Sequence, residues 1–406
     1  MGRKTGNVLA VLILTVITAS FLFPAAAVAE GEDGGPAEGG PVMEQEEFME
    51  QQLEQLGIED IREYWDDVLH NYGGFLPESY KGSLLEFIQS DKPFSLKEWL
   101  FGFLKFLFHE IIVNGKLLGT LILLAIFSMI LSHLQQAFEK HSISKVAYAI
   151  TYMVLLIIAL NSFHVAIQFT QQTIEAMSNF MISLLPLLLV LMASTGSITS
   201  VALFHPMIVF LVHTSGLFVQ YFVLPLLFMS ALLSIVSTMT DHYKVTKLAD
   251  LLRNIAAGGL GIFLTVFLGV ISVQGATAAV ADGIAIKTAK FVTGNFVPVV
   301  GRMFTDAADT VMGASVLVKN TVGVAGLILL LLICIFPALK VLSLALIYSF
   351  ASAVLQPLGG GPIIASLSII GKSVLYVFAA LSAVCLMFFL SITIMIISGN
   401  LSLMMR

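Results

Sequence analysis

The sequence is poor in charged residues and in cysteine. Charged side chains make up 11% of its 406 residues, whereas apolar residues make up 58%; soluble domains carry about 25% charged residues. This composition excludes a chain that is solvated by water throughout. The two cysteines, Cys334 and Cys385, both lie in apolar runs. The sequence therefore indicates neither a disulfide framework nor a thiol metal site.

The sequence also lacks the motifs of common enzyme classes. It contains no His-Glu-x-x-His, so a zinc protease is not indicated. Gly371-Lys372-Ser373 looks like the end of a phosphate-binding loop, but the position that must be glycine is Ser366. We therefore predict that the protein is not an enzyme, and we assign no catalytic, cofactor-binding or metal-binding residues.

The N-terminus has the pattern of a secretory signal. Arg3 and Lys4 precede an apolar run over residues 8–23, and Ala27-Val28-Ala29 forms a small-x-small cleavage pattern. The sequence predicts a cleavable signal peptide over residues 1–29. Removal of this peptide would leave a mature N-terminus on the outer side of the membrane.

The segment that follows is strongly acidic. Residues 30–110 carry a net charge of −14, whereas residues 111–406 carry +6. We interpret residues 30–95 as an extracytoplasmic segment with two short amphipathic helices between 44 and 72. In the second helix Ile61, Trp65, Val68 and Leu69 fall on one face. Helices this short bury little apolar surface alone and need a partner.

Residues 96–406 are predicted to form a multi-pass membrane domain. The apolar run 204–239 has 36 residues, too long for one crossing of a hydrocarbon core of about 30 Å. We predict a hairpin there, turning near Ser215-Gly216 or Pro225. This topology puts Lys244, Lys247 and Lys340 in the cytoplasm, as the positive-inside rule requires. The fold class is all-α, a polytopic helical membrane protein of about seven to nine spans.

One segment does not fit this topology. Residues 275–320 fall outside in the predicted topology, yet they carry more basic than acidic side chains. We interpret this segment as an amphipathic or re-entrant loop, on which the acidic segment docks. The alternative is a solvated or internally paired charge cluster. The candidate functional residues of this loop are Asp282, Lys287, Lys290, Pro298, Gly301, Asp306, Lys319 and Asn320.

Several short motifs are similar to those of one known family. They are Trp99, Phe108-His109-Glu110, Asn114-Gly115-Lys116-Leu117-Leu118-Gly119, Gln274-Gly275, Asp282, Lys287-Thr288-Ala289-Lys290, Pro298-Val299-Val300-Gly301, Lys319-Asn320, Gly323 and Gly326. With them, from about residue 44 to the C-terminus, the chain resembles the stage III sporulation protein AE family of endospore-forming bacteria.

The resemblance implies a multi-pass subunit in the mother-cell membrane that surrounds the forespore. Its implied partners are the other products of the stage III A operon, including an ATPase and a ring-forming protein, and a forespore membrane partner. The assembly would be a channel or secretion-like conduit needed for late forespore gene expression. Two alternatives stay open, a stand-alone secondary transporter with internally repeated helices and a membrane scaffold that conducts nothing. The lipid bilayer is a partner in every case, and nucleic acid in none.

Overall fold

A computed structural model describes residues 59–89, 95–137, 142–239, 244–296, 300–358 and 361–404, and these residues form helices and short turns without a β-strand. The predicted signal peptide lies outside them. The helices are α3 (Glu59–Tyr72), α4 (Leu84–Gln89), α5 (Leu96–Val113), α6 (Gly115–Ala137), α7 (Ser142–Ser194), α8 (Ile198–Phe218), α9 (Leu224–Met239), α10 (Thr246–Phe296), α11 (Val300–Leu355) and α12 (Pro362–Met404). Short 3-10 turns lie at Gly73–Phe75, Glu78–Tyr80 and Gln356–Leu358.

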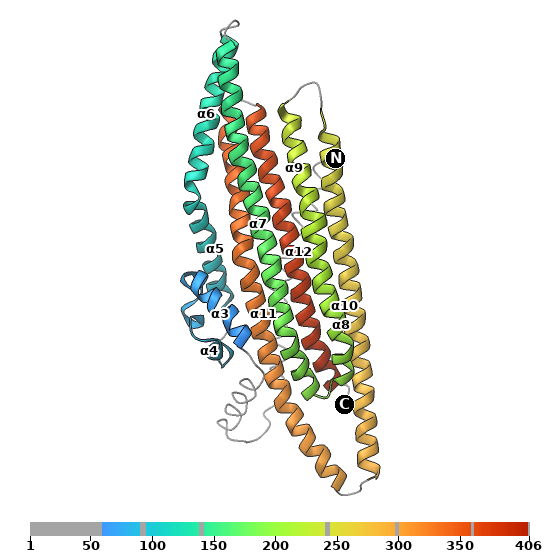
Figure 1. Cartoon of the computed structure of the whole chain (residues 1–406). Helices are drawn as coiled ribbons and strands as arrows, with labels where there is room; N and C mark the ends of the chain where they lie inside the picture. The colour runs from blue at the N-terminus through green and yellow to red at the C-terminus, as the bar shows by residue number, and fades with distance from the viewer. Residues whose placement is uncertain are drawn as a thin grey trace.

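The long helices lie side by side in an elongated bundle (Figure 1). Helix α12 packs against α11, α10, α9 and α7, and its apolar side chains fill the centre. The pair α5–α6 lines one edge, with α3 and α4 on its lower part, and α10 forms the opposite edge (Figure 1). Helix α7 has 53 residues, so it is about 80 Å long.

The predicted hairpin within 204–239 is wrong. Helix α8 continues into α9 through one π-helical turn, Val219–Val223, in which the Leu224 N–H donates to the carbonyl of Val219. This wider turn accommodates Pro225, which lacks an N–H, and the chain keeps its direction. Ser215 does not turn the chain either. It lies inside α8, and its hydroxyl donates to the Leu211 carbonyl one helical turn earlier.

The count of apolar helices is correspondingly lower than the seven to nine spans predicted. Five helices of the described chain are long and apolar enough to cross a membrane, or six if the bent pair α5–α6 counts as one crossing. Two apolar runs of the sequence, 146–167 and 180–193, could each be taken as a separate span, but both lie within the single helix α7. The last turns of α6, α9 and α11 and the first turns of α7, α10 and α12 lie at one end of the bundle (Figure 1). Lys244 and Lys247 flank the start of α10 at that end.

The described residues of the segment 275–320 form helices where the sequence suggested an amphipathic or re-entrant loop. They comprise the last part of α10 and the first part of α11, joined at positions 297–299. The two helix ends extend beyond the lower ends of α7, α8 and α12 (Figure 1). The segment is rich in Ala and Val, and its helices are therefore apolar over much of their length.

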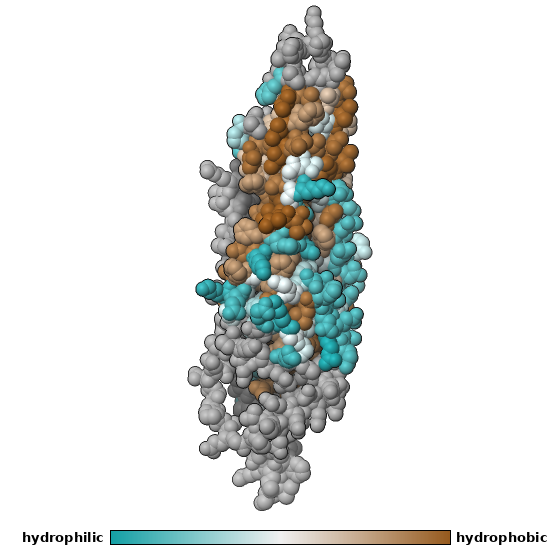
Figure 2. All heavy atoms as spheres, turned by 90° about the vertical axis from the view of Figure 1, so that its left-hand side faces the viewer, coloured by the Kyte–Doolittle hydropathy of each residue, from teal (hydrophilic) through white to brown (hydrophobic). Residues whose placement is uncertain are grey.

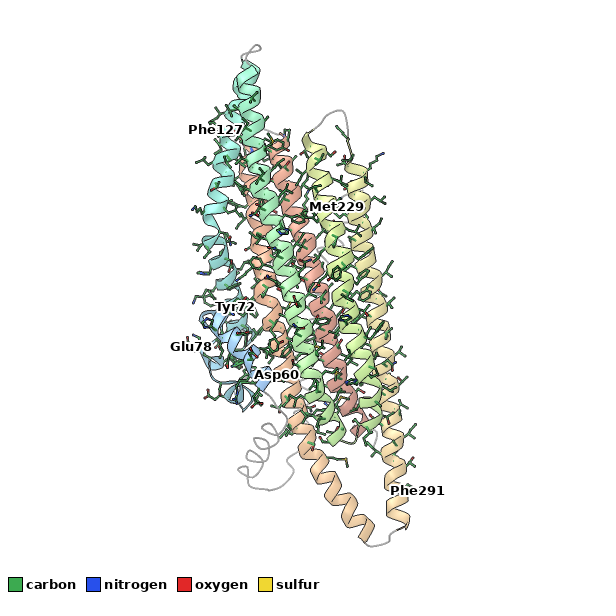
Figure 3. All side chains as sticks on the ribbon, viewed as in Figure 1. Asp60, Tyr72, Glu78, Phe127, Met229 and Phe291 are labelled. Atoms are coloured by element: carbon green, nitrogen blue, oxygen red, sulfur yellow. The ribbon has the colours of Figure 1, made fainter. Side chains whose placement is uncertain are left out.

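The second amphipathic helix of the acidic segment is confirmed as α3, with Ile61, Trp65 and Val68 buried. Trp65 stacks on Phe87 of α4 with ring centroids 4.6 Å apart and donates from Nε1 to the Gly82 carbonyl at 3.0 Å. We call α3, α4 and the turns between them the docking unit. Figure 3 places Asp60, Tyr72 and Glu78 in it, and Phe127 high on α6.

Among the described residues, the aromatic contacts that hold the docking unit lie outside the basic 275–320 segment, on which the acidic segment was expected to dock. The docking unit packs on α11 and α7, on the edge opposite α10 (Figure 1). Tyr72 lies parallel to Phe336 of α11 at 4.3 Å, and Tyr64 meets Phe180 of α7 edge-on at 5.3 Å. Aromatic burial therefore fixes the unit, because a desolvated ring contact outweighs attraction between exposed charges.

Candidate functional site: a buried polar layer at the α10–α12 contact

The first part of the candidate site is a buried carboxylate at the start of a helix. Asp282 of α10 is 1% exposed. Its Oδ1 accepts from the backbone N–H of Thr199 at 2.8 Å and of Ser200 at 3.2 Å. These donors belong to the first turn of α8, where backbone N–H groups lack helical partners and the helix dipole is positive. Asp282 thus caps α8 from another helix.

The chain geometry that presents these donors depends on one glycine. Gly196, between α7 and α8, has φ +83°, a left-handed conformation that costs glycine little. The Ser197 N–H bonds back to the Met192 carbonyl at 3.1 Å and closes the turn. The carboxylate of Asp282 meets α8 directly after this reversal.

The second part is a buried ammonium group. Lys319 of α11 is 1% exposed, and its Nζ donates to Oδ1 of Asn400 at 2.6 Å and to the Ile396 carbonyl at 3.3 Å, both on α12. A Cβ at Gly399 would lie 2.5 Å from this nitrogen. Glycine at 399 therefore makes room for the lysine head.

Two further glycines bring α12 close to its neighbours. The Ser398 hydroxyl donates to the Gly275 carbonyl of α10 at 3.3 Å, and a Cβ at Gly275 would lie 2.6 Å from Ile394. On α11, a Cβ at Gly323 would lie 2.7 Å from Ile396. The lower part of α12 is thus held between α10 and α11, and the helices approach closely where small residues allow it.

We call Asp282, Lys319, Asn320, Ser398 and Asn400 the polar layer. Within the described chain, the buried Oδ1 of Asn320 and Oγ of Ser200 have no hydrogen-bond partner. The same part of the chain holds no group of three or more His, Cys, Asp and Glu side chains that could bind a metal ion. Charge-assisted hydrogen bonds, which are stronger than neutral ones, join α10 to α8 through Asp282 and α11 to α12 through Lys319. The neutral bond from Ser398 to the Gly275 carbonyl joins α12 to α10.

Of the eight predicted residues, the structure thus buries Asp282 and Lys319 and bonds each to another helix, and it also buries the Oδ1 of Asn320. Lys287 is exposed on α10 instead. The backbone of Lys290 lies in α10, and those of Gly301 and Asp306 lie in α11. Pro298 lies outside the described residues. The alternative was a cluster of charges paired with one another. Asp282 and Lys319 are indeed buried and bonded, but each bonds to uncharged polar groups of another helix.

Sequence reasoning missed an ionic contact that lies beside the docking unit. Lys340 was expected in the cytoplasm, but its Nζ lies 4.0 Å from Oε1 of Glu110 on α5. It also lies 5.5 Å from the ring centroid of Tyr72 and 5.9 Å from that of Phe169, which are cation–π distances. Lys340 lines a pocket of about 300 Å³ with residues of α3 and α7. No sequence signal pairs Lys340 with Glu110, since 230 positions separate them.

The sequence of the chain is similar to that of one known protein family. A family model described as stage III sporulation protein AE matches residues 79–399. A protein of Bacillus subtilis (strain 168) with the name Stage III sporulation protein AE is 61% identical over 361 residues, which cover 89% of this chain and 90% of that protein. No solved structure matches the chain. The chain therefore belongs to the stage III sporulation protein AE family.

Proposed function

We propose that the protein is a non-enzymatic, multi-pass membrane subunit of a channel or secretion-like complex between mother cell and forespore. In this proposal it resides in the mother-cell membrane around the forespore and serves late forespore gene expression. Family membership supports a role in sporulation. The apolar helices support residence in a membrane.

The observation that carries the proposal is the excess length of the bundle. Helices α7, α10 and α11 have 53, 51 and 56 residues, so each is about 75–85 Å long, against a hydrocarbon core of about 30 Å. More than half of each helix therefore extends beyond the hydrocarbon core. A subunit that must contact partners outside the bilayer needs such a projection.

The surface favours one placement of the bilayer. On the α5–α6 side, apolar side chains gather over the upper part of the bundle and polar ones over the lower part, where the docking unit sits (Figure 2). Leu123, Phe127 and Ile130 of α6 and Ile150 and Ile157 of α7 are exposed apolar residues of the upper part. We place the bilayer around this part. The docking unit and the joined ends of α10 and α11 then project into the intermembrane space.

The same placement suggests where partners bind. An ATPase of the operon would meet the cytoplasmic end, where α10 begins beside Lys244 and Lys247. Attraction to anionic lipid headgroups holds such basic ends at the cytoplasmic surface. The ring-forming protein and the forespore partner would meet the projecting end. The polar layer lies in the projecting part and holds α10 and α11 to α12 there.

A stand-alone transporter is less well supported. Transporters with repeated helices bind substrate at unwound breaks within discontinuous helices. Here α7, α8 and α11 continue through Pro186, Pro206 and Pro337. Apart from the bend of 47° between α5 and α6, the described spans have no such break.

Deletion of the gene in the host, followed by microscopy of sporulating cells with a late forespore reporter, tests the proposal. We expect arrest after engulfment and a silent reporter, restored by the wild-type gene. Lys287→Glu, exposed on the projecting part of α10, should restore less than Lys287→Arg if that part meets partners. Normal sporulation of the deletion strain would contradict the proposal. Solute flux through the purified protein in liposomes would instead support the transporter.

A further inference from the structure

Helix α10 exposes an apolar face along nearly its whole length. In an 18-residue apolar stretch of this helix, only 17% of the residues are buried in the protomer. We define the α10 face by the exposed residues Leu248, Leu251, Ile255, Gly258, Gly261, Ile262, Val266, Gly269, Val270, Val273, Val280, Ile284 and Phe291. Ile262 is 70% exposed and Phe291 is 69% exposed. Figure 3 shows Phe291 near the lower end of α10.

This face carries almost no charge. Between Arg253 and Lys287 the chain has one charged side chain, Asp282. Asp282 does not belong to the face, because it is buried against the first turn of α8. Over these positions the face presents aliphatic side chains and glycines, as a helix does that lies against lipid or another helix.

Lipid alone does not cover the face. Leu248 and Phe291 are 43 positions apart, which corresponds to about 65 Å of helix, whereas the hydrocarbon core is about 30 Å thick. Helix α6 provides a contrast, because its 23 residues span about 35 Å and match the bilayer. About half of the α10 face would therefore meet water unless protein covers it. Exposed apolar patches of several hundred Å² mark interaction sites.

We infer that the α10 face binds the α10 face of a second copy of this chain. A strip about 65 Å long and about 10 Å wide offers roughly 650 Å² per protomer, close to the roughly 800 Å² per partner of a stable interface. Two copies inserted in the same direction are related by an axis along the membrane normal, so their α10 helices meet in parallel, residue against like residue.

The shape of the face suits such a self-contact. A Cβ added at Gly258, Gly261 or Gly269 would meet nothing within 4 Å in the protomer. These positions therefore leave shallow gaps between the ridges formed by Ile262 and Val266. In a parallel pair, ridges of one helix fill the gaps of the other, and small residues allow the close approach that dispersion requires.

Cysteine cross-linking of the full chain in native membranes tests the inference. Gly269→Cys places a thiol on the α10 face, and Gly119→Cys places one at an equally open position on α6. Because the native Cys334 and Cys385 are buried, the wild-type chain provides the background. With copper-phenanthroline as oxidant, Gly269→Cys should give a disulfide-linked dimer and Gly119→Cys should not.

A loss-of-contact variant provides the second measurement. Gly261→Leu combined with Gly269→Leu should weaken self-association at least tenfold, as measured by single-molecule photobleaching in dilute liposomes. The matched control, Gly119→Leu, should associate like the wild type. A wild-type chain that stays monomeric, a cross-link of Gly269→Cys only to a different protein, or an equal effect of Gly119→Leu would each overturn the inference.

Discussion

Helices α10 and α12 are similarly apolar, yet they occupy opposite environments. In an 18-residue apolar stretch of α12, 72% of the residues are buried inside the protomer, against 17% in the corresponding stretch of α10. Helix α12 lies at the centre of the bundle, and α10 lies at its edge. Hydropathy therefore identifies both as helices that avoid water but does not say whether lipid, the same chain or another chain surrounds them.

The two helices also differ in how they use polar residues. Helix α12 contributes Ser398 and Asn400 to the polar layer, where they bond to the neighbouring helices. Helix α10 turns one charged residue, Asp282, inward and leaves another, Lys287, exposed. Substitutions at matched positions of the core helix and the edge helix therefore test this comparison.

The largest effect is expected at the centre of the polar layer. Asn400→Leu removes the acceptor at 2.6 Å from the Lys319 ammonium and leaves a buried charge with one backbone carbonyl. We expect a loss of about 3 kcal/mol in the free energy of unfolding, measured by unfolding the purified protein in denaturing detergent. Adding Lys319→Met should restore most of it, since the pair is then apolar.

The matched control for this change is Asn254→Leu, on the exposed side of α10. Its effect should stay within about 0.5 kcal/mol. If Asn254→Leu destabilised the protein as much as Asn400→Leu, α10 would be as deeply packed as α12. The contrast between core helix and edge helix would then not hold.

The next effect concerns the inward-facing carboxylate of the edge helix. Asp282→Leu leaves the N–H groups of Thr199 and Ser200 buried without their acceptor, which should cost about 2 kcal/mol. Asp282→Asn keeps one acceptor oxygen and should cost less. The same unfolding measurement applies, with Lys287→Leu on the exposed side as the control. Equal losses for Asp282→Leu and Asp282→Asn would contradict the capping role.

A pair of glycine substitutions should give effects of opposite sign. A Cβ at Gly326 would lie 2.8 Å from Leu184 of α7, whereas at Gly269 of α10 it meets nothing. Gly326→Ala should therefore destabilise the detergent-solubilised monomer by about 1 kcal/mol. Gly269→Ala should stabilise it by up to about 0.5 kcal/mol, because alanine is the better helix former. Effects of the same sign would show that Leu184 moves aside.

Much of the fold was readable from the sequence, because apolar runs report directly on membrane helices. The helical class and the amphipathic pattern of α3 followed from residue spacing. The count of spans did not, since it depended on whether Pro225 turns the chain or is absorbed in a π-helical turn. The merging of two runs into α7 offsets the lost hairpin, so Lys244 and Lys247 lie at the end of the bundle where α7 and α12 begin.

The candidate site was predictable only in part, for a related reason. Charge in an apolar region marked Asp282 and Lys319 as unusual. The partners of Asp282, however, lie 82 and 83 positions away in the sequence, and those of Lys319 lie 77 and 81 positions away. Spacing within one segment cannot reveal such partners. The docking surface of α3 was predicted wrongly, because the prediction weighed its net charge and ignored Tyr64 and Tyr72 as aromatic anchors.

The smallest effect is expected in the docking unit, which lies outside both α10 and α12. Burial, with neighbouring carboxylates, raises the pKa of Tyr64, Tyr72 and Tyr80 above the usual value of 10.0. Above pH 10 the detached unit loses these protons more readily than the docked unit, so docking weakens as pH rises and is unaffected between pH 7 and 9. Limited proteolysis of the unit as a function of pH measures this. Replacing the three tyrosines by phenylalanine removes the phenolic protons and should flatten the profile above pH 10. If proteolysis of this variant still increased above pH 10, the pH dependence would come from other groups. Lys340, beside Tyr72, would then be the first to examine.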